Sequence, residues 1–326
     1  MKARTTPPAN VSTLSRKDVK RNLRRHRLIV AARNWELYVM LLPILIYFFI
    51  FEIAPLPGLQ IAFKDFKISK GIWGSEWASS YGFKYFIRFV KSPMFKQLMT
   101  NTLRISLYSL VAGFAPPIIL ALLLNYQKHD KFKKLVQSLS FAPHFISMVV
   151  FVGMLRLFFQ DLGIVNRLLE LIGMKHVNFL GDPDIFPHLY VWSGIWKGVG
   201  WSSIIYVGAL SNVSPELHEA AIADGANLWK RIWHIDIPGI MDTILTLLIL
   251  DCGGILSVGF EKVYLMLNDL NSSKAEVIST YVYKQGLQGG QFSYSTAIGL
   301  FNSVVNFIMV MLVNTITKKM RDISIL

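Results

Sequence analysis

The polar residues with the clearest chemical pattern lie in a short segment between two apolar stretches, residues 214–238. Ser214 can cap a helix whose first position is Pro215. Two carboxylates, Glu216 and Glu219, fall in the opening turns of that helix, where the helix dipole favours negative charge. The spacing predicts a short, acidic helix that a partner surface can contact, and the chemistry is docking rather than bond making.

The second half of this segment predicts how closely a partner can approach and where the chain turns. Small side chains at Ala220 and Ala221 leave the predicted helix thin, and Asp224 comes at its end. Gly225 can adopt positive φ and reverse the chain. A second helical run over residues 227–235 then leads to Pro238, at the mouth of the next apolar stretch. The alternative interpretation is an ordinary amphipathic helix-turn-helix between two spans.

Motifs for enzymatic chemistry are absent from the sequence. There is no Gly-x4-Gly-Lys-Ser/Thr loop to bind a nucleotide and no His-Glu-x-x-His pair. Cys252 is the single cysteine, so a cysteine-rich zinc site is excluded, and the seven histidines are scattered. We therefore predict that the chain is no enzyme, binds no metal and carries no cofactor of its own.

Two charged residues fall inside apolar stretches, where hydrocarbon makes a charge costly unless it is paired or faces water. They are Lys197 and Asp251. One interpretation is that both line a polar pathway. The other is that they form an ion pair that holds two helices together, and the sequence leaves both open.

Aromatic side chains cluster in the same stretch as Lys197. Aromatic faces stack on the CH surfaces of sugars, but tryptophan is also common at membrane interfaces. Any single tryptophan can therefore serve packing or the interface instead of a sugar. The predicted pathway set is Trp192, Trp196, Lys197, Trp201, Asp251 and Asn302.

The elements that must position these residues are membrane spans. The 326 residues are 53% hydrophobic with a mean hydropathy of +0.42, which is too apolar for an ordinary soluble domain of this length. Several stretches approach the roughly 20 apolar residues that cross a bilayer, and long runs in lipid form helices. We predict an all-α membrane protein with six transmembrane helices over residues 37–53, 101–124, 140–159, 188–210, 240–260 and 293–316.

The distribution of Lys and Arg predicts the orientation. With the amino terminus inside, the inner segments carry more Lys and Arg than the outer ones, which is the bias of cytoplasmic loops. Both termini and the loop at 212–238 are then cytoplasmic. Residues 1–34 are predicted to be a basic, disordered arm, and residues 35–326 one membrane domain. The net charge of +14 is therefore a topology signal, and no nucleic-acid-binding face is visible.

The docking segment resembles the EAA loop of binding-protein-dependent ABC importer permeases. The family pattern is Glu-Ala-Ala, three residues, Gly, then nine residues to Ile-x-Leu-Pro. In this sequence it stands as 219–221, Gly225 and 235–238, with Ile237 where leucine is usual. The resemblance implies that Glu216, Glu219, Ala220, Ala221, Asp224, Gly225 and Pro238 couple the chain to an ATPase.

Further segments resemble the LplB-like polysaccharide permeases of the carbohydrate-uptake branch, from about residue 34 to the end. They cover residues 34–38, 59–65, 193–197, 259–263 and 297–303. The resemblance implies a type I (maltose-permease-like) fold in a bacterial cytoplasmic (inner) membrane. It also implies a second related permease, two cytoplasmic ATPases that bind ATP-Mg, an extracytoplasmic solute-binding protein and an oligosaccharide substrate.

The predicted function is therefore the permease subunit of an ATP-driven importer for oligosaccharides or polysaccharide fragments. Two alternatives remain: a permease for another small solute, and a secondary transporter driven by a gradient without an ATPase. A membrane-embedded enzyme or scaffold is a third class, and it needs a buried catalytic cluster that the sequence does not provide.

Overall fold

The computed structural model describes residues 33–254, 256 and 258–321, and the chain divides into two units, Met1–Leu59 and Gln60–Leu326. Residues 1–32 of the predicted basic arm lie outside the described residues. In the first unit, α2 (Trp35–Phe48) contains Pro43 and continues as the π-helix η1 (Phe49–Ile53). Every residue of these two helices is exposed, as expected for apolar helices that lipid or another chain covers.

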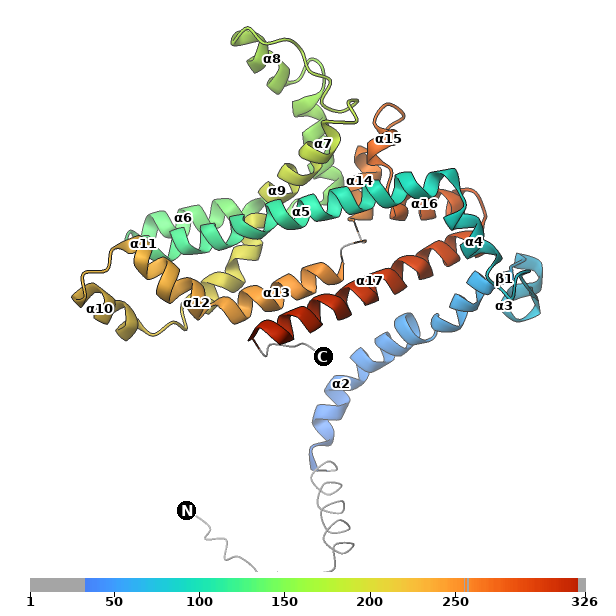
Figure 1. The fold of residues 1–326 in the computed structure, drawn as a ribbon, viewed down its shortest axis with the longest axis horizontal. Coiled ribbons are helices and arrows are strands. Elements are labelled where there is room, and N and C mark those ends of the chain that lie inside the picture. The colour runs from blue at the N-terminus through green and yellow to red at the C-terminus, as the bar shows by residue number, and fades with distance from the viewer. Residues whose placement is uncertain (1–32, 255, 257, 322–326) are drawn as a thin grey trace, which may run out of the picture. The chain divides into compact units, whose positions relative to one another are not determined.

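Long helices form the frame of the second unit (Figure 1). Helix α5 begins at Ser92, whose side chain accepts a hydrogen bond from the Met94 amide at 3.2 Å, and Pro93 occupies the first position. It packs most extensively against α9, while α13 packs against α17. The bounds are α5 (Pro93–Tyr126), α9 (Phe186–Leu210), α13 (Met241–Gly253) and α17 (Phe292–Arg321).

Four helices of the described chain are long and apolar enough to cross a bilayer: Trp35–Phe63, Pro93–Tyr126, Met148–Leu171 and Phe292–Thr315. The other two predicted spans correspond to α9 and α13. Helix α9 has 25 residues, but its serines, glycines and lysine lower its hydropathy. Helix α13 has only 13 residues, which reach about 20 Å of the roughly 30 Å hydrocarbon layer. The count of six therefore stays a prediction.

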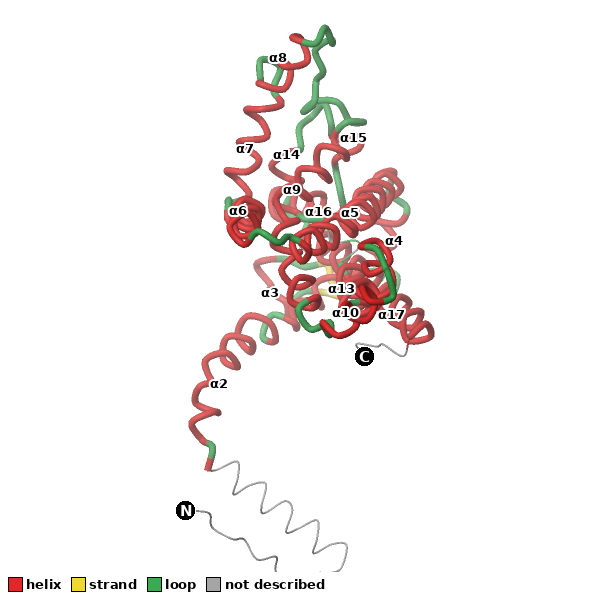
Figure 2. The backbone as a smooth tube through the Cα atoms, turned by 90° about the vertical axis from the view of Figure 1, so that its left-hand side faces the viewer, coloured by secondary structure: helices red, strands yellow, loops and turns green. Residues whose placement is uncertain are grey.

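The third predicted span begins later than the sequence suggested. Residues 140–159 do not form one helix, because α6 (Asp130–Phe141) ends before a 3-10 turn, η4 (Ala142–Phe145), that contains Pro143. Proline lacks the amide that an α-helix needs at this point. The chain resumes as α7 (Met148–Phe159), capped by Ser147, and α8 (Ile164–Leu171). In Figures 1 and 2, α7 and α8 project away from the layer of α5, α13 and α17.

The segment between residues 56 and 90 contains the one departure from an all-α fold among the described residues. A 3-10 helix, η2 (Leu56–Phe63), leads into β1 (Lys64–Asp65), which pairs antiparallel with β2 (Glu76–Trp77). Asp65 accepts hydrogen bonds from the Lys84 ammonium at 2.7 Å and the Tyr85 hydroxyl at 2.6 Å, and these bonds lower its pKa. Between and after the strands come η3 (Ile68–Lys70), α3 (Gly71–Gly74) and α4 (Lys84–Val90).

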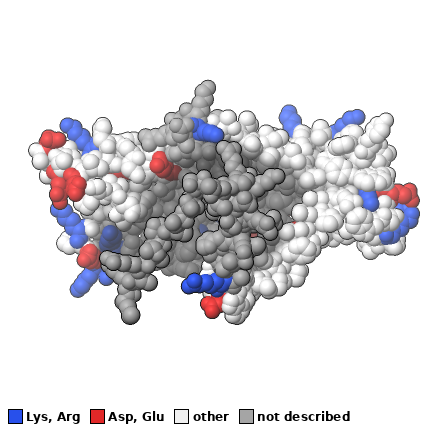
Figure 3. Space-filling view, turned by 90° about the horizontal axis from the view of Figure 1, so that it is seen from below, with Lys and Arg blue, Asp and Glu red and all other residues white. Residues whose placement is uncertain are grey.

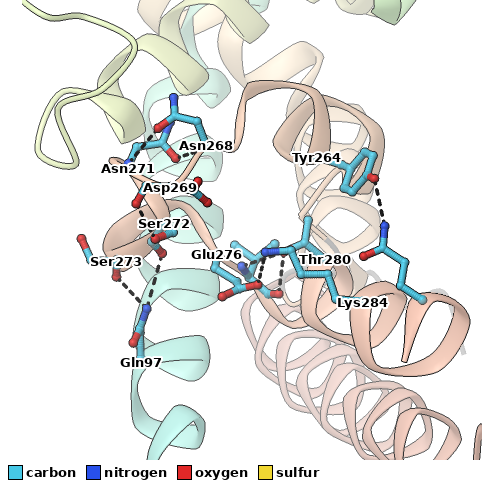
Figure 4. A network of polar contacts seen from close by, with 12 residues as sticks. Gln97, Tyr264, Asn268, Asp269, Asn271, Ser272, Ser273, Glu276, Thr280 and Lys284 are labelled. Atoms are coloured by element: carbon cyan, nitrogen blue, oxygen red, sulfur yellow. Dashed lines mark hydrogen bonds and ion pairs between the residues drawn. The ribbon is translucent and has the colours of Figure 1, made fainter. Parts of the chain in front are cut away.

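A polar network fixes the chain between α13 and α17 (Figure 4). The Asn101 amide of α5 donates to the carbonyls of Ser273 and Glu276, at 3.0 and 2.9 Å. The Glu276 carboxylate, which is nearly buried, pairs with Lys284 at 2.7 Å. The elements held in this way are α14 (Phe260–Met266), α15 (Ser272–Ala275), α16 (Ile278–Tyr283) and the π-helix η6 (Lys284–Gln288).

Gly200 on α9 is expected to be essential for the packing of α6. A Cβ at this position would lie 2.2 Å from the Ser140 carbonyl oxygen, so α6 and α9 would have to separate. We expect Gly200→Ala to cost on the order of 3 kcal/mol and to lower the melting temperature of the purified protein in detergent. Gly208→Ala on the same helix is the control, since nothing lies within 4 Å of its Cβ position. Equal melting temperatures for the two variants would contradict this packing.

Candidate functional site

The docking segment forms the short helix that its sequence predicts. Helix α10 (Pro215–Ala223) begins at Ser214, whose hydroxyl accepts from the Glu216 amide at 3.3 Å. The helix ends in a Schellman motif: the Ala226 amide donates to the Ala221 carbonyl at 2.8 Å. Gly225 supplies the left-handed residue of this motif, with φ of +75°.

Most of the residues predicted to meet a partner are exposed. Glu216, Glu219, Ala220, Asp224, Gly225 and Pro238 are exposed, and Ala221 is half-buried. No side chain of α10 belongs to the core. Figure 1 places α10 at one end of the second unit, beyond α12 and α13. Figure 3 shows acidic and basic side chains at both ends of the view and in smaller groups along its upper and lower edges. Helix α10 is therefore an exposed helix of the second unit.

A buried carboxylate anchors this helix to the rest of the unit. After α11 (Leu228–Arg231), the π-helix η5 (Ile232–Asp236) ends at Asp236, which is fully buried, and α12 (Ile237–Gly239) follows. The Asp236 carboxylate accepts a 2.5 Å hydrogen bond from Tyr126, the last residue of α5. Its other oxygen lies 3.3 Å from Nε2 of His218 on α10. Asp236 thus joins α5, α10 and η5.

Two adjoining cavities lie between α5, α9 and the α13–α14 connection. One has a volume of about 310 Å³ and the other about 280 Å³, and both are lined by Ser109, Gly113 and Tyr190. Ser106 and Asp251 belong to the first cavity. The shared lining residues are small or aromatic, so the backbone and the Tyr190 ring shape much of this space.

Lys197 and Asp251 are not brought together as an ion pair, and no ion pair among the described side chains includes either. The Lys197 ammonium donates to the carbonyls of Pro143 and His144 in η4, at 3.2 and 2.7 Å. Asp251 is exposed to the first cavity. The Lys197 ammonium therefore contacts carbonyl groups, whereas the Asp251 carboxylate lies at the first cavity.

The predicted aromatic residues make different contacts. The Trp192 indole donates to the Tyr108 hydroxyl at 2.9 Å, and Trp196 stacks on Phe151 at 6.0 Å between ring centroids. Trp201 stacks on His144, with centroids 4.4 Å apart. All three indoles remain about half exposed. None of them lines the two cavities described above.

Asn302 lies on α17 and is half-buried. Its Oδ1 is buried and has no hydrogen-bond partner among the described residues. No group of three His, Cys, Asp or Glu side chains within 33–254, 256 and 258–321 is placed to hold a metal ion.

Comparison with protein families matches residues 117–322 to the binding-protein-dependent transport system inner membrane component. The matched range includes α10, Asp236 and the residues of α9, α13 and α14 that line the two cavities. This chain belongs to that family. The permease is also 44% identical to Protein LplB of Bacillus subtilis over 288 residues, 88% of this chain and 90% of the relative. It is 45% identical to the polygalacturonan/rhamnogalacturonan transport system permease protein YteP of the same organism over 301 residues, 92% and 93% of the two chains.

A solved structure agrees with this membership. The permease matches a chain of a bacterial ABC transporter involved in the import of the acidic polysaccharide alginate, with a TM-score of 0.82 and 39% identity. The match covers 91% of this chain and 99% of that chain. A second structure of the alginate transporter, in complex with an alginate pentasaccharide-bound periplasmic protein, matches with the same TM-score and 38% identity. The relatives are transport permeases, so the permease is a transport subunit and not an enzyme.

Two buried charged groups of the permease escaped the sequence analysis as site residues. In the family pattern, Asp236 is only the variable position x of the Ile-x-Leu-Pro ending. In the structure, its carboxylate contacts Tyr126 and His218 and so anchors α10. Lys262 on α14 is 5% exposed and lines the second cavity. The sequence did contain a pattern from which the burial of Lys262 could be predicted. Lys262 is four residues before Met266, and this spacing places both side chains on one helix face. Met266 is buried as well.

Proposed function

We propose that the permease imports oligosaccharides or polysaccharide fragments as part of an ATP-driven transporter. The observation that carries this proposal is the similarity over about nine-tenths of the chain to YteP, whose name gives polygalacturonan and rhamnogalacturonan as its cargo. The cavities between α5, α9 and α13 provide space for a solute within the helix frame. Their lining includes hydroxyl groups and a carboxylate, which suit the hydroxyls of a sugar.

The proposed assembly has four kinds of partner. A second, related permease completes the pathway, and a solute-binding protein delivers the sugar, as the periplasmic protein in the alginate transporter complex suggests. Two ATPase subunits bind ATP-Mg and receive α10 in a groove. Glu216, Glu219, Ala220 and Ala221 form the contact, while Asp224, Gly225 and Pro238 set its ends. Closure of the ATPases then moves α10 as a rigid body and switches the pathway between inward and outward access.

The proposed topology has six spans with both termini cytoplasmic. It assigns α9 and the broken α13–α14 segment to the fourth and fifth spans. A helix that breaks at membrane depth is tolerated where it lines a cavity, and Gly254, Val258 and Gly259 do line one. The bias of Lys and Arg toward the inner segments supports the same orientation.

A transport assay separates this proposal from a gradient-driven transporter that acts alone. The permease is purified from its own cells through an affinity tag, reconstituted with its copurifying subunits, and given binding protein and labelled oligosaccharide. We expect copurification of an ATPase with a phosphate-binding loop, and uptake that requires ATP and stops with a non-hydrolysable analogue. Uptake that an ion gradient drives in liposomes without any ATPase would overturn the proposal.

A further inference from the structure

Lys262 is a deeply buried cation with only neutral partners. Its side chain is 5% exposed, and its ammonium donates to the Tyr190 carbonyl at 2.5 Å. The ammonium lies 4.4 Å from the centroid of the Tyr190 ring and 5.4 Å from that of Phe151. The protein therefore supplies this amine with carbonyl and ring contacts but not with an opposite charge.

No carboxylate of the described chain compensates this charge. None of the ion pairs of the described residues includes Lys262. A second cation contacts the same ring, since the Lys197 ammonium lies 5.8 Å from the Phe151 centroid and donates to the carbonyls of Pro143 and His144. Two ammonium groups near one ring and without a carboxylate partner are costly to bury, and a cost of this kind makes the group a candidate for a functional site.

The Lys262 side chain forms part of the wall of the 280 Å³ cavity between α5 and α9. Gly194 lies directly against it, because a Cβ at Gly194 would be 3.1 Å from the Lys262 nitrogen. The missing side chain leaves room beside the ammonium. The Tyr190 carbonyl accepts one hydrogen bond from this nitrogen, and an ammonium group has three donors in total.

We propose that Lys262 binds a carboxylate of an acidic oligosaccharide and gives the pathway a preference for uronate-containing chains. This inference rests on the proposed function and names the substrate class of the same pathway. A carboxylate in the cavity would accept a charge-assisted hydrogen bond from the ammonium and supply the missing counter-ion. The Tyr190 ring, which both cavities share, offers an apolar face against a sugar ring.

The test compares two probes on the reconstituted transporter: trigalacturonate and its methyl ester, which has the same sugar rings without charge. Binding is measured by calorimetry in nanodiscs without the binding protein, so that only the membrane complex selects. We expect the wild type to prefer the acid by about tenfold or more, the factor that one charge-assisted hydrogen bond provides. In Lys262→Met this preference is lost, while affinity for the methyl ester changes little.

A purely structural role for Lys262 predicts a different result. If the bond to Tyr190 mainly joins α14 to α9, Lys262→Met lowers the melting temperature and leaves the acid preference intact. Our inference expects an equal or higher melting temperature, because methionine fills the same space without a buried charge. Lys262→Arg, which keeps the charge, should retain part of the preference. Lys274→Gln is the control, since it removes a half-buried lysine that pairs with Asp184 and lines neither cavity.

Retained preference in Lys262→Met, or no binding of either probe by the wild type, overturns the inference. The ATP-dependent uptake assay then decides whether the proposed function fails with it. A transporter that takes up saccharides with ATP but binds both probes equally remains a sugar importer without a charge filter. A transporter that takes up no saccharide removes both proposals.

Discussion

Gly225→Asp is expected to uncouple ATP hydrolysis from uptake and to reduce transport per ATP by about tenfold. Gly225 has φ of +75°, in the left-handed region that aspartate and asparagine tolerate better than other residues with a side chain, so the added charge is the main change. The new carboxylate also stands next to Asp224 at the end of α10, where the helix dipole disfavours negative charge. The ratio of labelled sugar imported to phosphate released, in the reconstituted transporter, measures the coupling.

Two matched variants separate charge from backbone strain and from general damage. Gly225→Asn has the same shape without the charge, and asparagine tolerates positive φ, so it should retain most of the transport. Gly173→Asp places the same substitution at a closely similar turn, because Gly173 has φ of +77° and follows α8 in a Schellman motif of the same kind. Normal transport per ATP in Gly225→Asp, at normal expression, would mean that α10 is not the docking element.

The sequence was sufficient for α10 because local rules determine that helix. The Ser214 cap, the proline after it and the glycine at its end each act within a few residues of one another, and the structure confirms all three. Pro143 shows the limit of span assignment by hydropathy, since it lies in the turn that follows α6, inside the predicted span over residues 140–159.

The environment of the buried charges depends on contacts far apart in the sequence. Lys197 meets the carbonyls of η4, more than 50 residues away, and no local pattern distinguishes these carbonyls from Asp251 as its partner. Lys262 is buried because α14 packs against α7 and α9 contributes the Tyr190 carbonyl. The exposed, locally specified half of the candidate site was therefore predictable, whereas the buried half required the tertiary structure.

Asp236→Ala is expected to destabilise the permease by about 3 kcal/mol and to abolish most of the coupled transport. Removing one partner of a buried, hydrogen-bonded carboxylate leaves the others without compensation, here the Tyr126 hydroxyl and His218. The same substitution removes the contact between α10 and α5. The other half of α5 contributes Ser106 and Ser109 to the wall of the first cavity. Melting temperature and transport per ATP should therefore fall together.

A control and a double-mutant cycle test whether the contact itself is responsible. Asp242→Ala removes an exposed aspartate from the first turn of α13 and should cost only about 0.5 kcal/mol, the value of a helix-dipole interaction. Tyr126→Phe, Asp236→Asn and their combination then isolate the 2.5 Å hydrogen bond. Residues in contact usually show interaction energies of about 0.5–3 kcal/mol. If the two single effects simply add, Tyr126 and Asp236 act independently, and force from α10 must reach α5 through other contacts.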